Sequence, residues 1–145
     1  MRTGLRIMLA ALCAGLLAGC ETPPPGKVVK LCFDAFVAKK YEQALLYCGP
    51  EVHQFYSNNL WLATVHSQTA KRTTYAITAD ETTSLTTALV TVSLHFDLGD
   101  TSAVDWLLRL EMARRNRWYV DGVAFLNPDG TLRGNALTII PDLAY

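Results

Sequence analysis

The sequence predicts an α+β fold, in which N-terminal helices pack on a curved antiparallel sheet of four to six strands. In the first half of the chain, apolar residues recur with the spacing of an amphipathic helix. In the second half they alternate with polar residues, as in half-buried strands. Helical segments followed by a run of antiparallel strands are typical of a domain in which helices cover one face of a sheet.

The chain begins with a segment that has the anatomy of an export signal. Arg2 and Arg6 form a positive n-region, and an uncharged apolar stretch of 11 residues follows, Ile7 to Leu17. This stretch is too short for a permanent membrane-spanning helix, which needs about 20 apolar residues. We therefore expect residues 1–19 to be a signal peptide.

The apolar stretch ends at Leu17, and Leu17-Ala18-Gly19-Cys20 resembles the lipobox of bacterial lipoprotein precursors. The resemblance implies that signal peptidase II cuts before Cys20 and that acyl chains on its thiol, palmitate among them, hold the protein on the lipid bilayer. Glu21 follows, whereas aspartate there retains enterobacterial lipoproteins in the inner membrane, so the resemblance implies the periplasmic face of the outer membrane. The alternative is an uncleaved anchor, or a secretory leader cut nearby that leaves Cys20 a free thiol.

The mature chain is expected to start with a tether and to carry nearly balanced charge. Residues 20–26 comprise the lipidated cysteine and a segment with three consecutive prolines, which favour an extended conformation. Residues 27–145 have the length of one domain. Without Arg2 and Arg6 the chain has 11 basic and 13 acidic residues, so its charge gives no reason to expect nucleic acid as a partner.

Helical periodicity occurs in three segments of the first half. The apolar face of residues 27–39 comprises Val29, Cys32, Phe33 and Phe36. The apolar face of residues 41–48 comprises Tyr41, Ala44, Leu45 and Cys48, and Gly49-Pro50 terminates that helix. These two segments predict a helical hairpin. A third helical stretch is expected between residues 51 and 68, interrupted or bent around Asn58-Asn59.

Alternation predicts four strands in the second half. The apolar face of residues 88–96 comprises Ala88, Val90, Val92, Leu94 and Phe96. That of residues 104–112 comprises Val104, Trp106, Leu108, Leu110 and Met112. Asp97 to Thr101, with Gly99, joins the two as a hairpin. A further strand is expected at residues 117–123 and a weaker first strand at residues 73–79.

Two motifs of this domain resemble the nuclear transport factor 2-like, or cystatin-like, superfamily. The opening motif comprises Val29, Phe33, Ala35 and Phe36, followed by Lys40-Tyr41-Glu42-Gln43-Ala44. The motif of the last strand is Arg117-Trp118-Tyr119-Val120-Asp121-Gly122. The match spans roughly residues 27–124 and is most similar to small bacterial lipoproteins with this cone-shaped fold. The resemblance implies a curved sheet with a cavity but no particular activity, because the superfamily includes isomerases, dehydratases and binding or scaffolding members.

Cys32 and Cys48 form a candidate disulfide. Each lies about eight residues from the turn at Lys40, so antiparallel helices would bring the two thiols opposite one another. The periplasm is oxidising, and a loop of about 15 residues closed by a disulfide contributes roughly 3 kcal/mol in the chain-entropy model. The alternative is two reduced cysteines packed as small hydrophobes. Cys13 leaves with the leader.

Six aromatic residues are candidates for lining a cavity that takes an apolar ligand: Phe33, Phe36, Tyr75, Phe96, Trp106 and Trp118. The same positions would equally suit a filled core. His53, His66 and His95 are scattered and no Cys-x-x-Cys is present, so neither a metal nor another cofactor is expected. His95 and Asp97 point to the same side of their strand, which would suit either a general base with its orienting carboxylate or a solvated strand end.

A cluster of positive charge lies at the turn before the last strand. Its residues, Arg114, Arg115 and Arg117, have the composition of a phosphate-binding patch. Residues at a hairpin tip are typically solvated, and export removes nucleic acid from reach.

The sequence therefore predicts a noncatalytic envelope module that is anchored to the membrane and binds a protein partner or a small apolar molecule. One alternative is an isomerase- or hydrolase-like enzyme, and a titratable group deep in the pocket with a shifted pKa would favour it. Another is an accessory subunit of a secretion or conjugation apparatus, which a large exposed apolar patch would favour.

Overall fold

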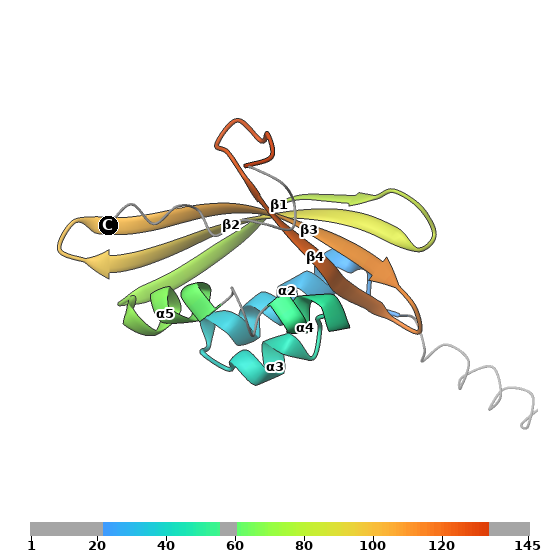
Figure 1. Cartoon of the computed structure of the whole chain (residues 1–145), viewed down its shortest axis with the longest axis horizontal. Helices are drawn as coiled ribbons and strands as arrows, with labels where there is room; N and C mark the ends of the chain where they lie inside the picture. Colours follow the sequence, from blue (N-terminus) through green and yellow to red (C-terminus); the bar gives the residue numbers. More distant parts are fainter. Residues whose placement is uncertain (1–21, 56–60, 134–145) are drawn as a thin grey trace, which may run out of the picture.

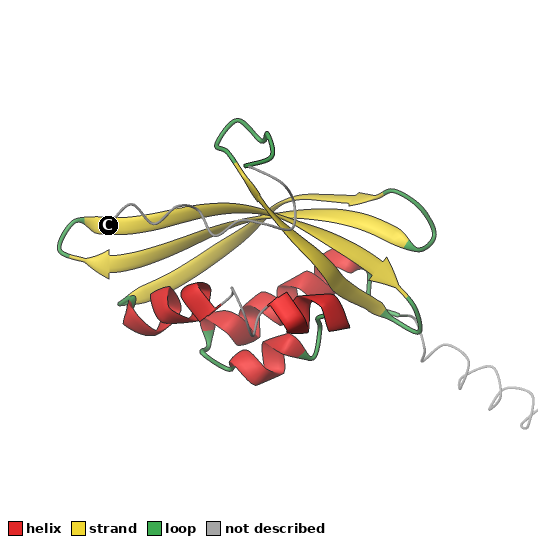
Figure 2. Cartoon of the chain, viewed as in Figure 1, coloured by secondary structure: helices red, strands yellow, loops and turns green. Residues whose placement is uncertain are grey.

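The fold is α+β, with helices on one face of an open four-stranded antiparallel sheet (Figures 1 and 2). The computed structural model describes residues 22–55 and 61–133. The signal segment, the lipobox with Cys20 and the bend expected at Asn58-Asn59 lie outside the described residues. None of the described helices is long and apolar enough to cross a bilayer.

The first helix, α2 (Pro25–Val37), begins two residues before its predicted start. Proline is well suited to the first turn of a helix, because its fixed φ is helical and the N–H it lacks has no partner there. Pro24, directly before the helix, is extended with φ −63° and ψ 160°. The extended segment therefore ends at Pro24, and Pro25 and Gly26 of the expected tether belong to the helix.

The second helix, α3 (Tyr41–Leu45), is shorter than predicted because the chain after it pairs with the sheet. The Gly49 amide donates to the Val120 carbonyl at 2.7 Å, and the Val120 amide donates to the Tyr47 carbonyl at 2.9 Å. A Cβ at position 49 would collide with the Asp121 carboxylate. A side chain at position 49 would therefore displace the Asp121 carboxylate, and the helix ends before this residue.

The next two helices are α4 (Pro50–Phe55) and α5 (Trp61–Thr69). The four strands are β1 (Arg72–Thr82), β2 (Thr87–Gly99), β3 (Ser102–Arg114) and β4 (Trp118–Leu126). They pair antiparallel in chain order. Each of the four strands is longer than predicted. The backbone hydrogen bonds continue past the residues in which apolar and polar side chains alternate. The β2–β3 turn is formed by residues 99–102, within which Gly99, Asp100 and Thr101 have positive φ.

The register of β2 and β3 places their apolar residues side by side on one face. Val90, Val92 and Leu94 lie opposite Leu110, Leu108 and Trp106. Bulges interrupt the pairing at Thr78 of β1, between Ile77 and Ala79, and at Asp121 of β4, opposite Glu111 and Met112 of β3. A bulge bends its strand and increases the local twist. The core lies on this face, under α2, and includes Val29 and Phe96, both fully buried.

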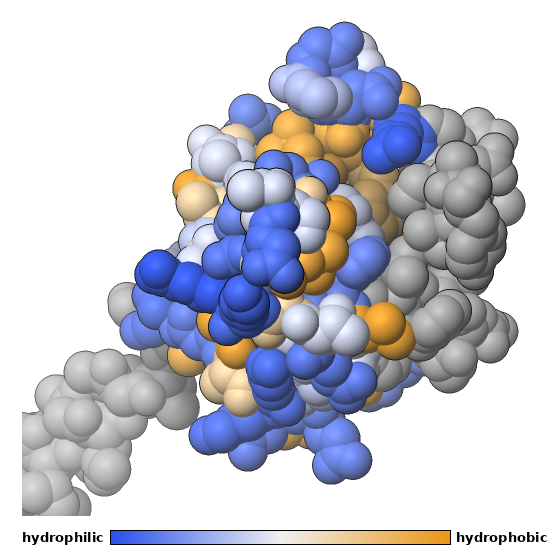
Figure 3. Space-filling model, turned by 90° about the vertical axis from the view of Figure 1, so that its left-hand side faces the viewer, coloured by the Kyte–Doolittle hydropathy of each residue, from blue (hydrophilic) through white to orange (hydrophobic). Residues whose placement is uncertain are grey.

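The surface at the β2–β3 end of the molecule is mainly hydrophilic, with hydrophobic residues in separate patches (Figure 3). The large hydrophobic side chains with the greatest exposure among the described residues are Leu31, Leu46, Leu85 and Leu132. Leu85 and Leu46 lie at the opposite end of the sheet, near the turn between β3 and β4.

A polar contact ties α2 to β1. The Tyr75 hydroxyl donates to the Asp34 carboxylate at 2.5 Å, and Lys30 pairs with the same carboxylate at 2.6 Å. The hydrogen bonds from Lys30 and Tyr75 lower the pKa of Asp34. Burial, and then the bond to Asp34, raise the pKa of Tyr75. The ionised carboxylate therefore stabilises the fold above its unfolded-state pKa, and this contribution is lost as the pH falls through the folded-state pKa.

Tyr75→Phe is expected to lower the free energy of unfolding by about 1 kcal/mol at neutral pH, because it removes the hydrogen bond between the helix and the sheet. The loss is expected to shrink in acid, where Asp34 is protonated in both proteins. Urea denaturation at neutral and acidic pH measures both effects. Tyr119→Phe is the control, since in the described part of the chain its hydroxyl donates to the nearby Asn116. Equal losses in the two variants would contradict the prediction.

Candidate functional site

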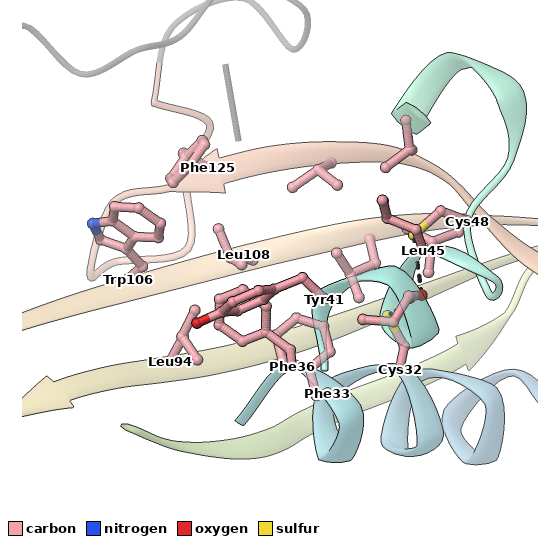
Figure 4. Close-up of a pocket in the computed structure, with 15 residues that line it drawn as sticks. Cys32, Phe33, Phe36, Tyr41, Leu45, Cys48, Leu94, Trp106, Leu108 and Phe125 are labelled. Carbon is pink, nitrogen blue, oxygen red and sulfur yellow. Dashed lines mark hydrogen bonds between the residues drawn. The ribbon is translucent and has the colours of Figure 1, made fainter. Parts of the chain in front are cut away.

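A cavity of about 80 Å³ lies between the helices and the sheet (Figure 4). Its helical wall comprises Cys32, Phe33, Phe36, Tyr41, Ala44 and Leu45, with Cys48 and Val52 beyond them. Its sheet wall comprises Leu94, Trp106, Leu108, Leu110, Val120, Val123 and Phe125. The surface that faces the cavity is entirely apolar.

Local periodicity explains both walls of the cavity. Residues three and four positions apart share one face of a helix, which brings Cys32, Phe33 and Phe36 together on α2. Residues two positions apart share one face of a strand, as Trp106, Leu108 and Leu110 do on β3. The walls are therefore continuations of the two apolar faces that also form the core.

An aromatic cluster closes the Trp106 end of the cavity. The Trp106 ring makes edge contacts with Phe96 and Phe125, each with ring centroids 5.2 Å apart. His66 lies edge-on to Trp106 at 5.6 Å. Burial lowers the pKa of His66, which favours the neutral imidazole beside these rings. Edge-to-face packing of this kind holds aromatic rings in a fixed orientation.

Tyr41 connects the cavity wall to α5. Its ring meets Phe36 edge-on at 5.6 Å, and its hydroxyl donates to Ser67 Oγ at 3.1 Å. Ser67 is fully buried, so the bond satisfies a polar group that water cannot reach. Tyr41 thus presents its ring to the cavity and directs its hydroxyl away into a hydrogen bond.

The structure brings three of the six candidate aromatics to the cavity: Phe33, Phe36 and Trp106. The other three lie elsewhere. Tyr75 faces Asp34, Phe96 packs in the core beside Trp106, and Trp118 is buried near the β3–β4 turn. Alternation identifies the face of a strand but not the distance of a residue from the cavity along that strand, so it does not separate these three residues from those that line the cavity.

Sequence reasoning missed several lining residues, and for some of them a signal was present. Tyr41, Ala44 and Leu45 belong to an apolar helical face that the periodicity had marked as buried. Leu94 belongs to the apolar face of its strand. Phe125 lies beyond the predicted end of the last strand, and only the pairing of β4 with β3 places it opposite Leu108.

The thiols of Cys32 and Cys48 lie near one backbone carbonyl at the cavity wall. Cys32 Sγ donates to the Ala44 carbonyl at 3.4 Å, and Cys48 Sγ lies 3.8 Å from the same oxygen. Both are free thiols in this structure, and the disulfide stays a prediction. The interaction with the neighbouring Cys48 thiol, and then burial, raise the pKa of Cys32, whereas the interaction with Cys32 lowers the pKa of Cys48.

In the reduced protein, Cys48 is expected to react with a thiol-alkylating reagent before Cys32. The thiolate is the reactive form, and Cys48 combines the lower pKa with the greater exposure. Peptide mass spectrometry after timed alkylation over a rising pH series measures the order. Cys48→Ser should remove the fast phase and Cys32→Ser should retain it. Faster alkylation of Cys32 would contradict the assignment.

The three histidines lie apart from one another. His53 Nε2 contacts the Leu45 carbonyl at 2.9 Å, and His66 lies in the aromatic cluster. His95 Nδ1 pairs with Asp105 of the neighbouring strand at 2.6 Å. His95 thus takes its carboxylate partner from the neighbouring strand, while Asp97 accepts the Gly99 amide. Within residues 22–55 and 61–133, no group of three metal-ligating side chains is close enough to hold an ion.

The arrangement is suited to excluding water from a small apolar group. Among the described residues that line the cavity, the titratable ones are Cys32, Cys48 and Tyr41, and neither a carboxylate nor an imidazole faces it. Comparison of the chain with protein-family models, with curated protein sequences and with solved structures found no match.

Proposed function

We propose that this protein is a lipid-anchored lipoprotein of the bacterial cell envelope, whose α+β domain is a noncatalytic module that binds a small apolar molecule. The observation that carries the binding role is the cavity with an entirely apolar surface between the helices and the sheet. Burial of apolar surface away from water is the main favourable contribution to binding in such a site.

The size of the cavity restricts the ligand. Pockets for drug-sized molecules have volumes of about 300–1,000 Å³, far above the 80 Å³ here. A ligand that fits without rearrangement is a small ring or the end of an acyl chain. Aromatic side chains at both walls, Phe36 and Trp106 among them, offer rigid surfaces for such a group.

The nuclear transport factor 2-like cone is part of the proposal. Its support is the placement of helices on one face of the sheet, the bulges that bend two strands, and the position of the Arg117-Trp118-Tyr119 motif at the start of β4. In such a cone the cavity would be the space enclosed by the curved sheet and α2. Anchoring is supported by the charged n-region, the apolar stretch and the lipobox that ends in Cys20.

An enzyme on the same scaffold has less support. The interaction with Cys48, and then burial, raise the pKa of Cys32 and so keep its thiol neutral, which disfavours it as a nucleophile. The lowered pKa of Cys48 is explained by its interaction with the neighbouring Cys32 thiol. The noncatalytic function therefore accounts for the lining residues with fewer assumptions.

Ala44→Leu tests the binding function, because it places a larger side chain in the cavity while keeping a good helix former in α3. The probe is benzene, titrated into the acylated full-length protein in lipid nanodiscs. Backbone amide shifts of cavity residues, followed by nuclear magnetic resonance, report occupancy. The wild type is expected to show saturable shifts, and Ala44→Leu is expected to weaken the apparent affinity about tenfold or more, equivalent to at least about 1.4 kcal/mol.

Ala38→Leu is the matched control, since it adds the same atoms at an exposed position after α2. Its titration should match that of the wild type, and benzene that dissolves in the lipid affects all three proteins equally. Shifts that fail to saturate in the wild type, or that are unchanged in Ala44→Leu, would contradict the proposal.

A further inference from the structure

The turn between β3 and β4 lies beside the N-terminal end of the described chain. Arg114 Nη2 donates to Thr22 Oγ1 at 3.1 Å, across 92 positions of sequence. Thr22 is two residues from Cys20, and two residues of fully extended chain span about 7 Å at most. An acyl anchor on Cys20 would therefore keep this turn close to the surface of the bilayer.

Two exposed leucines lie next to the same turn. The Arg114 amide donates to the Thr86 carbonyl at 2.8 Å, and Leu85, just before Thr86, is 86% exposed. Arg117 Nη2 donates to the carbonyl of Leu46, which is 62% exposed. Figure 1 shows the β1–β2 and β3–β4 turns at the same end of the sheet. Cationic and apolar side chains are thus combined at the end of the domain nearest Cys20.

The arginines at this end carry charge that the protein only partly neutralises. All three are exposed. Arg115 pairs with Asp121 at 3.1 Å, and among the described residues neither Arg114 nor Arg117 has an ion-pair partner. The guanidinium of Arg117 stacks over the Tyr119 ring at 4.9 Å, which orients it without neutralising it.

We propose that this end of the domain is a membrane-contact surface for anionic phospholipids. We define the anchor-side surface as Arg114, Arg115, Arg117, Leu46 and Leu85. Guanidinium groups bind phosphate oxygens through paired hydrogen bonds, and exposed leucines can enter the headgroup region. The inference rests on acylation of Cys20, because the anchor keeps Arg114 close to the lipid charges, whose attraction is screened over about 8 Å, one Debye length at physiological ionic strength.

Hydrogen–deuterium exchange on the acylated full-length protein tests this contact. The protein is reconstituted into vesicles of phosphatidylcholine alone and into vesicles that also contain phosphatidylglycerol. Amides of residues 83–87 and 114–118 are expected to exchange at least about threefold more slowly on the anionic vesicles, and high salt should remove the difference because it screens phosphate contacts. Intact mass records acylation separately, so failure of the anchor and failure of the contact are distinguished.

The triple variant Arg114→Gln, Arg115→Gln and Arg117→Gln should lose the lipid-dependent protection. The matched control is Lys39→Gln, Lys71→Gln and Arg72→Gln, which removes three exposed positive charges at the opposite end, the end seen in Figure 3. This control should behave as the wild type. Equal exchange of the wild type on both vesicles would overturn the proposal, and so would protection seen only when other envelope proteins are present, which would indicate a protein partner. The salt series on the wild type decides the question even if the triple variant does not fold.

Discussion

Cys20→Ser is expected to abolish the incorporation of labelled palmitate and to leave the leader uncut. In the proposed function, the thiol at position 20 is the atom that receives diacylglycerol, and a serine hydroxyl cannot replace it. The loss should be complete rather than graded. Metabolic labelling of cells that express the full chain measures incorporation, and intact mass spectrometry measures whether residues 1–19 are removed.

Cys13→Ser is the matched control, because Cys13 lies within the apolar stretch of the leader and not at the lipobox. It is expected to be labelled and cut as the wild type is. Palmitate that enters Cys20→Ser, or a wild-type chain that is unlabelled and retains its leader, would refute the assignment as a lipoprotein. The cavity and its ligand would then have to be considered in another compartment.

Phe96→Ala is expected to cause one of the largest losses of stability among single substitutions at described positions. The ring is fully buried and packs against Trp106 at 5.2 Å and His66 at 5.6 Å. Truncation of a buried phenylalanine to alanine typically costs about 3–5 kcal/mol, because transfer free energy is lost and a cavity remains. With an m value of about 2 kcal/mol/M, the midpoint of urea denaturation should fall by about 2 M.

Leu107→Ala provides the comparison, since Leu107 lies on the other face of the sheet and is only half-buried. Its midpoint is expected to fall by less than half as much. The Phe96 ring packs against Trp106, which lines the cavity. Phe96→Ala should therefore also weaken benzene binding, even though Phe96 itself does not line the cavity. A midpoint within error of the wild type would show that the aromatic cluster does not stabilise the fold as argued.

The core of the sheet could be predicted from alternation alone. Val90, Val92 and Leu94 were expected on the apolar face of a strand, and all three are fully buried. Val104 was expected on the same face as Trp106 but is half-buried. It lies near the β2–β3 turn, where the helices cover the sheet less completely. Alternation identifies the face of a strand, whereas burial depends also on what lies above it.

Helix ends could be predicted less well than helix faces. The apolar face of residues 41–48 was identified correctly, and Tyr41, Ala44, Leu45 and Cys48 all line the cavity. The helix nevertheless ends at Leu45, because the chain after it pairs with β4 through Tyr47 and Gly49. A segment that covers the free edge of a strand gains hydrogen bonds that a continued helix would not provide there.

The sequence by itself determined which segments are helix or strand and which face of each is apolar, because these properties depend on residues a few positions apart. Only the tertiary structure decided which of those residues surround the cavity, that two thiols meet at the Ala44 carbonyl, and that Arg114 lies beside Thr22. Such contacts join residues far apart in the chain. Which residues meet depends on the packing and register of the whole domain, and a local sequence pattern carries no information about either.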